Sequence, residues 1–470
     1  MPRLQTPAPF LFGLARLAGV AACLALPACR PHTSETVSTA PVSEETTIEV
    51  TRGSIRRRAD RAALAPPFWL AIGLVDPAAA ERGAKTGEER LFAGAFRALV
   101  EGRDDDALVL FAGLTNASDE SVRSASRTGQ TLVMQAQGRW SEIAALESAA
   151  DVIEPVDRAS IFVWGRAFAQ LPPAVIRVQA LSARLPLRIS TAGTPVIQVR
   201  INGSERNFWL DTGASLSIVA SDVARQLGVA TIGHDTLALA TWGGRVNAVP
   251  GVVARLEIGS MQATGVPVAI LDPTALQFQR TSGSGEIGST VRLDGVIGMD
   301  MLRHLAVTLD VRSGEVTIGR PAKRDGDPSR RNLYWLGFPV TRLVASSGRS
   351  ALFGIDTGAD STTVGESWFL VDSAAQLLSR PGKLLGLGET SVTTLQVVRQ
   401  MLLSDGAYTV RLRNVTIAPE RRSTFITMDG VLGSDFIRSS VVHIDFASGE
   451  FSIRPTHRPR MRDAIDVTSH

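Results

Sequence analysis

The spacing of apolar residues is helical in one part of the chain and alternating in the next. Within residues 84–172, Leu91, Ala95 and Leu99 lie on one helical stripe, with Phe92 and Phe96 beside it. This stripe predicts a small α-helical domain.

Two similar segments, which begin at Gly102 and Gly138, are each typical of an elbow between two helices. Their spacing is near the period of tetratricopeptide-like arrays. Two interpretations remain open: an array that binds a protein partner, and a helical domain that packs on its neighbour.

From Pro186 onward the period becomes two, which predicts β-strands. Residues 195–203 form a strand that enters an Asn-Gly turn, and the return strand ends at Asp211. A short helix capped by Ser221 is expected next. The same order of strand, hairpin and aspartate recurs over residues 338–356. The chain is therefore predicted to be mainly β, with two similar halves after the helical domain.

Two Asp-Thr-Gly triplets mark the halves, at residues 211–213 and 356–358. Each is followed by a similar block, at residues 294–302 and 429–437. The triplets are 145 positions apart and the later blocks 135, so the copies differ by ten residues between triplet and block. The repetition of a whole series of motifs indicates a duplicated module.

Composition excludes some functions. The 470 residues are 44% hydrophobic and 20% charged with a net charge of +3, which is ordinary for a globular protein and gives no basic face for nucleic acid. The six histidines lack the spacing of metal ligands.

The N-terminus reads as an export signal over residues 1–29. Its end, Leu26-Pro27-Ala28-Cys29, resembles a bacterial lipoprotein signal in which Cys29 is lipidated, although Pro27 leaves secretory cleavage or an uncleaved anchor open. Residues 30–83 are predicted to be a flexible tether, and residues 457–470 a basic tail. The predicted location is the cell envelope, as a membrane-anchored protein at the periplasmic face or as a secreted one.

Residues 183–456 resemble a pepsin/retropepsin-type aspartic peptidase, closest in style to retropepsin-like bacterial proteins. The resemblance is carried by the triplets and by the later turns Val296-Ile297-Gly298 and Val431-Leu432-Gly433. It implies two β-barrel lobes, residues 183–320 and 330–456, that form a pepsin-like pseudo-dimer within one chain. Pairing of lobes between chains is the alternative.

The resemblance also implies roles for the loop residues. Asp211 and Asp356 would share one proton and hold a water that attacks the peptide carbonyl. Two threonines would exchange hydrogen bonds across the lobe interface, and two glycines would allow close approach of the loops. These residues are Thr212, Thr357, Gly213 and Gly358. No metal or cofactor is required.

A cover over the site is expected from residues 240–246, a hairpin tipped by Gly243-Gly244 with Trp242 as lid residue. Packing of Trp242 on the base of its own hairpin is the alternative. Residues 385–390, with Gly388, are the equivalent in the second copy.

Four further aspartates repeat in the two copies. Asp294 and Asp429 are interpreted as turn residues, and Asp300 and Asp435 as helix caps. The predicted function is an endopeptidase for protein or peptide substrates of the bacterial cell envelope. The alternative is a non-catalytic peptide-binding protein.

Overall fold

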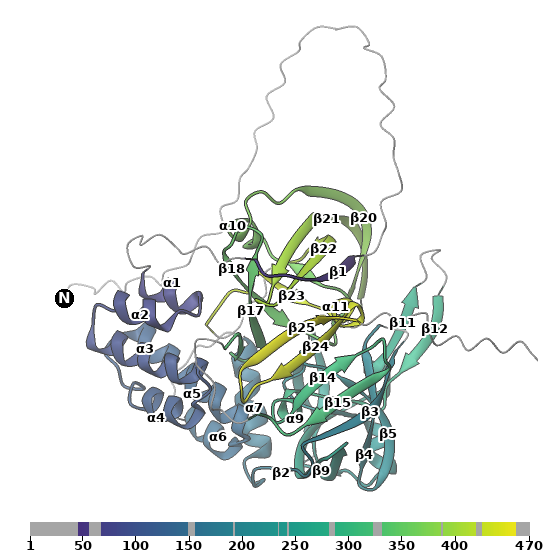
Figure 1. The fold of residues 1–470 in the computed structure, drawn as a ribbon. Coiled ribbons are helices and arrows are strands. Elements are labelled where there is room, and N and C mark those ends of the chain that lie inside the picture. Colours follow the sequence, from purple (N-terminus) through teal and green to yellow (C-terminus); the bar gives the residue numbers. More distant parts are fainter. Residues whose placement is uncertain are drawn as a thin grey trace, which may run out of the picture. The chain divides into compact units, whose positions relative to one another are not determined.

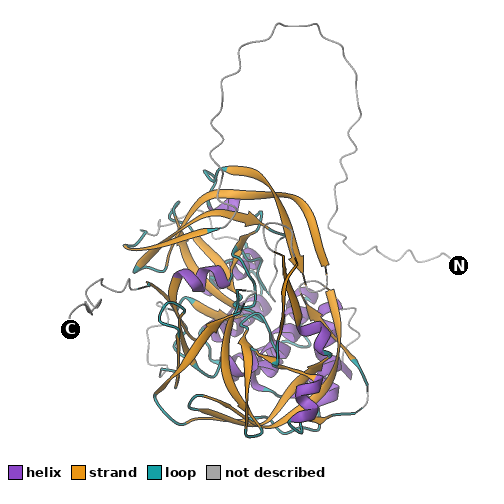
Figure 2. Ribbon diagram, turned by 90° about the vertical axis from the view of Figure 1, so that its right-hand side faces the viewer, coloured by secondary structure: helices purple, strands orange, loops and turns teal. Residues whose placement is uncertain are grey.

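Two closed rings of β-strands and a group of helices form the described part of the chain (Figures 1 and 2). The computed structural model describes residues 46–55, 67–148, 156–190, 193–233, 235–241, 244–281, 287–322, 331–386, 389–419 and 425–456. Their buried apolar side chains form a continuous hydrophobic core. The mainly β fold predicted from the sequence is confirmed.

The first ring closes because its last strand pairs back with its first. In the order in which neighbours pair, its strands are β4 (Pro195–Ile201), β5 (Ser204–Leu210), β13 (Gly295–Ile297), β6 (Ile218–Ala220), β10 (Met261–Leu271) and β9 (Gly244–Ile258). Arg200 of β4 lies opposite Glu257 of β9 and completes the ring. Asn202 and Gly203, with φ of 47° and 90°, form the predicted turn between β4 and β5.

The second ring has the same connectivity. In the same order, its strands are β17 (Pro339–Ala345), β18 (Ser350–Ile355), β23 (Gly430–Leu432), β19 (Thr363–Val364), β22 (Tyr408–Ile417) and β21 (Glu389–Ser404). Val344 of β17 lies opposite Ser404 of β21 and completes this ring. The duplication inferred from short motifs therefore extends to the order of every strand in the two rings.

A sheet joins the two halves. Its strands are, in order, β25 (Glu450–Pro455), β24 (Ser440–Asp445), β14 (Ala306–Asp310), β15 (Glu315–Gly319) and β3 (Ser182–Ile189). Leu309 of β14 lies opposite Val442 of β24, so the junction is an antiparallel pairing. A contact of 2.8 Å between the Thr308 hydroxyl and His443 Nδ1 crosses the same junction.

Short elements complete each half. They are α8 (Ser221–Gln226), β7 (Ala230–Thr231), α9 (Met299–Leu302), β16 (Leu333–Trp335), α10 (Trp368–Val371) and α11 (Ser434–Ser439). The prediction that Ser221 caps α8 is wrong by one residue. Ala220, the last residue of β6, holds the cap position, because the helix starts directly from the strand.

The ten-residue difference between the copies lies mainly in one segment. Residues 272–294 of the first half correspond to residues 418–429 of the second. The longer segment contains η1 (Pro273–Leu276) and the hairpin of β11 (Gln277–Thr281) and β12 (Ile287–Arg292). This hairpin accounts for the extra length of the first copy.

The helices of the N-terminal region lie together in Figure 1, coloured purple to blue. They are α1 (Phe68–Gly73), α2 (Pro77–Gly83), α3 (Gly87–Val100), α4 (Asp104–Ala112), α5 (Glu120–Gln137), α6 (Trp140–Ser148) and α7 (Val156–Phe168). Gly102 and Gly138 lie at the two predicted elbows. Leu91 was expected on the buried stripe but is 56% exposed, because the buried face is centred on Phe92 and Phe96.

The predicted tether is wrong over two stretches of residues 30–83. Residues 68–83 contain α1 and α2, so the helical region begins earlier than expected. Strand β1 (Thr47–Arg52) pairs antiparallel with the start of β22. In the first half β2 (Val175–Val178) pairs in the same way with the start of β10. The backbone groups along β22 bind this strand, a long-range pairing that the local composition does not reveal.

Several predicted features lie outside the described residues: the export signal of residues 1–29 with Cys29, and the tail of residues 457–470. Among the described residues, no helix has the length and apolar character needed to cross a membrane.

Candidate active site

Both Asp-Thr-Gly loops begin where a ring strand ends. Asp211 follows β5, which pairs in parallel with β13, and Asp356 follows β18, which pairs in parallel with β23. The Asp211 N–H donates to the Ile297 carbonyl at 3.0 Å, and the Asp356 N–H donates to the Leu432 carbonyl at the same distance. Each apolar-apolar-Gly turn therefore holds the start of its own aspartate loop.

The two loops meet through their threonines. The Thr212 hydroxyl donates to the Ile355 carbonyl at 2.7 Å and accepts from the Thr357 N–H at 3.0 Å. In return, the Thr357 hydroxyl donates to the Leu210 carbonyl and accepts from the Thr212 N–H at 3.0 Å. Both threonine side chains are buried. This reciprocal exchange fixes one loop against the other.

The glycines bring each loop next to the carboxylate of the other. A Cβ on Gly213 would lie 2.5 Å from Asp356 Oδ1, and a Cβ on Gly358 would lie 2.5 Å from Asp211 Oδ2. Glycine is required at these positions because any side chain would collide with the opposite carboxylate. The two carboxylates thus face the same narrow space between the loops.

Main-chain amides orient both carboxylates. The Gly213 N–H donates to Asp211 Oδ1 at 2.8 Å. Asp356 Oδ1 accepts from the N–H groups of Gly358 and Ala359 at 3.1 and 3.0 Å. Asp356 is buried, whereas Asp211 is half-buried. Carboxylates held in this way are positioned to bind a water and to exchange a proton with it.

Comparison with known proteins agrees with this geometry. Residues 197–301 match the model of a family described as aspartyl protease. The matched segment runs from β4 to α9 and includes Asp211 and the turn at Gly298. This match supports an aspartyl protease lobe in the first half. No curated protein matches the chain.

Behind each aspartate loop lies a second aspartate with a buried carboxylate oxygen, which was expected from the sequence to be a helix cap. Asp300 accepts a hydrogen bond from the Ser217 hydroxyl at 2.7 Å, and the same hydroxyl accepts from the Gly298 N–H. Gly298, not an aspartate, holds the cap position of α9. The prediction that Asp300 caps the helix is therefore wrong, because its side chain turns back toward the loop.

Asp435 has the equivalent place in the second half. It accepts from the Thr362 N–H at 2.8 Å and from the Thr362 hydroxyl at 2.7 Å, and that hydroxyl accepts from the Gly433 N–H. Gly433 caps α11, so Asp435 is not the cap either. The sequence repeat could have predicted both hydroxyl–aspartate pairs. A hydroxyl residue follows each Asp-Thr-Gly triplet at the same distance, and an aspartate follows the glycine of each later turn.

Asp294 and Asp429 also accept hydrogen bonds from strand residues that are remote in the sequence. Asp294 accepts from the Asn207 N–H of β5 at 3.2 Å, and Asp429 accepts from the Leu352 N–H of β18 at 2.8 Å. Besides forming turns, they hold the strands that carry Asp211 and Asp356.

Burial gives Asp300 an expected effect on the pH dependence of stability. Burial raises the pKa of Asp300 to about 7, and its Oδ2 has no hydrogen-bond partner among the described residues. The unfolded chain has an ordinary aspartate pKa of about 3.9. Between these values the folded state keeps a proton that the unfolded state has lost, so stability falls as pH rises from about 4 to about 7.

Asp300 contributes at most about 4 kcal/mol to this fall in the free energy of unfolding. We expect Asp300→Asn to reduce the fall, because asparagine does not ionise. Urea unfolding at several pH values between about 4 and 8 measures it, with the exposed Asp235→Asn as control. If the free energy of unfolding changes with pH in the same way in wild type and in Asp300→Asn, Asp300 is not the group that causes the fall.

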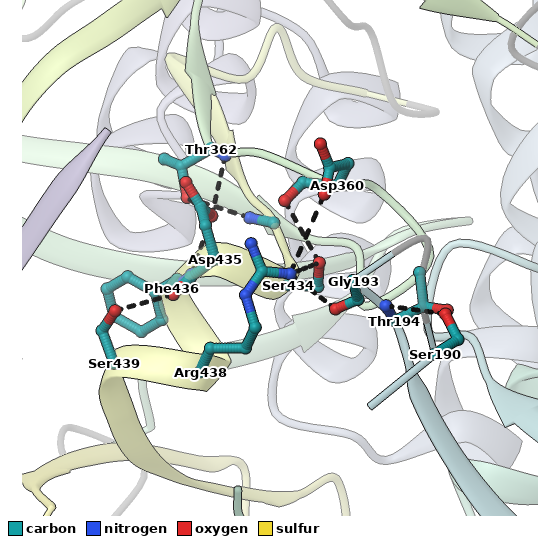
Figure 3. A network of polar contacts seen from close by, with 11 residues as sticks. Ser190, Gly193, Thr194, Asp360, Thr362, Ser434, Asp435, Phe436, Arg438 and Ser439 are labelled. Atoms are coloured by element: carbon teal, nitrogen blue, oxygen red, sulfur yellow. Dashed lines mark hydrogen bonds and ion pairs between the residues drawn. The ribbon is translucent and has the colours of Figure 1, made fainter. Parts of the chain in front are cut away.

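A polar network joins the first lobe to the second loop (Figure 3). Arg438 of α11 donates to the Gly193 carbonyl at 2.6 Å and to the Ser434 hydroxyl at 2.9 Å, and lies 3.8 Å from Asp360. Gly193 has φ of 88°, and a Cβ there would meet Arg438 at 2.4 Å. The turn after β3 thus contacts the segment that directly follows the Asp356 triplet.

Each lobe also carries a hairpin in the part of the chain where the sequence predicts a cover over the site. In the first, β8 (Leu237–Thr241) pairs with β9, and Thr241 lies opposite Gly244. Gly244 therefore belongs to a strand, and the prediction that it lies at the tip is wrong. In the second, β20 (Leu377–Gly386) pairs with β21, and Gly386 lies opposite Glu389. Trp242, Gly243 and Gly388 lie outside the described residues.

Within the ranges that the structure describes, no group of three or more histidine, cysteine, aspartate or glutamate side chains is placed to hold a metal ion.

Proposed function

We propose that the protein is an aspartic endopeptidase in which Asp211 and Asp356 form the catalytic pair. The observation that carries the proposal is the mutual approach of the loops, in which each glycine lies against the other loop's carboxylate. The threonine exchange supports it, because it leaves little freedom for the carboxylates to move apart.

Two carboxylates in one narrow space do not both ionise easily, so one proton is shared between them. The ionised member takes a proton from a bound water, which attacks the peptide carbonyl. The protonated member donates a hydrogen bond to the developing oxyanion. Return of the proton to the departing amine completes the cleavage.

We further propose that the two lobes act as a pepsin-like pseudo-dimer within one chain. The continuous sheet through β14 and β24 supports this pairing. The hairpins β8–β9 and β20–β21 would then cover an extended peptide from both lobes, since their strands occupy equivalent places. The mass of the protein in solution tests the pairing, because lobes exchanged between chains would give a dimer.

Incubation of residues 30–470 with a diverse peptide mixture, followed by mass spectrometry, tests the activity. We expect internal peptide bonds to be cleaved, and a statine-type inhibitor to suppress the cleavage because it occupies the place of the attacking water and the carbonyl. Peptide binding without cleavage between about pH 3 and 8 would favour the non-catalytic alternative.

The site of action is proposed to be the bacterial cell envelope, with a lipid on Cys29 as anchor. The sequence Leu26-Pro27-Ala28-Cys29 after an apolar stretch supports this. We expect Cys29→Ser to move the protein from the membrane fraction to the soluble fraction, because one acyl-bearing residue is lost. Unchanged fractionation beside a Cys23→Ser control would contradict lipidation.

A further inference from the structure

The helical region contacts the covering hairpin of the first lobe directly. Trp164 of α7 is 4% exposed, and its indole N–H donates to the Ala238 carbonyl of β8 at 3.2 Å. Ala238 lies opposite Asn247 of β9. An indole from outside the hairpin thus binds β8 three residues before the strand ends at Thr241.

The helix that carries Trp164 is itself closely packed. The Trp164 ring lies 5.5 Å from the ring of Phe168, and Phe168 lies 5.2 Å from Trp140 of α6. A Cβ on Gly165 would approach Ile143 to 2.8 Å, so α7 and α6 are in close contact. The position of Trp164 is therefore set by the helical region as a whole.

That region is held by both lobes. Arg303, which follows α9, forms an ion pair of 3.0 Å with Asp104 of α4, with side-chain exposures of only 13% and 28%. Phe425 of the second half places its ring 6.0, 5.6 and 6.3 Å from those of Phe92, Phe96 and Phe111. These contacts connect the helices to the residues that follow α9 in the first lobe and to the segment before β23 in the second.

A two-stranded hairpin is only marginally stable by itself. The outer part of β8–β9 therefore depends on what lies beside it for a defined position. We propose that Trp164 is a positioning residue, which sets where the β8–β9 hairpin lies over the substrate. This inference rests on the proposed function, and it assigns to the helical region control of substrate capture in the first lobe.

The variant Trp164→Phe tests the proposal in the full chain, because phenylalanine keeps an aromatic ring against Phe168 but removes the indole N–H. A hydrogen bond is worth about 1 kcal/mol, so we expect hydrogen exchange of residues 237–248 to become about 2- to 10-fold faster. Trp140→Phe is the matched control, because it alters the other partner of Phe168 in the same region.

Kinetics with fluorescein-labelled casein provide the second measurement. We expect KM to rise by about 3-fold or more in Trp164→Phe and kcat to change less than about 2-fold, since the catalytic pair is untouched. If Trp164→Phe does not fold, Trp164→His is used instead, because histidine has a ring that retains an N–H. We then expect hydrogen exchange of the hairpin to stay near the wild-type rate.

Unchanged hairpin exchange in Trp164→Phe, or equal acceleration in Trp140→Phe, would overturn the proposal. A fall in kcat with constant KM would also overturn it. If wild type fails to cleave casein and all peptides but the hairpin still responds to Trp164→Phe, the proposed function fails while the positioning of the hairpin by Trp164 stands.

Discussion

Replacing Asp211 or Asp356 by alanine is expected to abolish peptide cleavage while the fold remains intact. In the proposed mechanism each carboxylate has its own task in proton transfer, and the loss of one such group typically lowers the rate by about 10²- to 10⁴-fold. Because the mechanism needs both members of the pair, either substitution would remove the shared proton. Initial rates on a peptide cleaved by the wild type measure the loss.

Asp211→Asn and Asp356→Asn separate chemistry from packing. Asparagine retains an oxygen that accepts from the loop amides at Gly213 and Gly358, but it does not ionise. Circular dichroism checks the fold, and Asp235→Asn is the exposed control. Comparable turnover by either single variant would leave the paired mechanism without support.

Replacing Thr212 by valine is expected to cause the largest loss of stability. The change removes the donor to the Ile355 carbonyl and the acceptor of the Thr357 N–H. Two buried groups then lack partners, at about 1–3 kcal/mol each, which gives about 2–6 kcal/mol in all. Thr357→Val should have a similar effect, because the exchange is reciprocal. Urea unfolding measures the change in the free energy of unfolding.

Thr212→Ser is the matched control, because serine keeps the hydroxyl and loses only a methyl group. We expect it to retain most of the stability and most of the peptidase rate. Equal losses for valine and serine would mean that packing, and not the hydrogen bonds, holds the loops together.

Local motifs predicted the loops well because the chemistry of a tight turn is encoded in adjacent residues. The Asn202-Gly203 turn follows from residue types that favour positive φ. The alternating strands before Asp211 and Asp356 likewise follow from patterns a few residues long. Prediction was weaker where a short motif can have several structural roles. Asp300 is an example, since an aspartate at the start of a helix usually caps it.

Pairings between distant residues were not predictable from such patterns. Strand β1 lies in a stretch whose composition suggests a tether, but its backbone groups are bound by β22, more than 350 positions later. The packing of Phe92 likewise involves a remote residue, because its ring contacts that of Phe425 from the second half.

The sequence by itself determined that this chain contains a duplicated module with one aspartate loop in each copy, because repeated motifs and their order are properties of the chain. Only the tertiary structure decided that the helical region lies against the hairpin through Trp164, and that Asp300 and Asp435 support the loops from behind. The physical reason is that these contacts arise when remote segments pack together, and packing depends on shape and burial that adjacent residues do not specify.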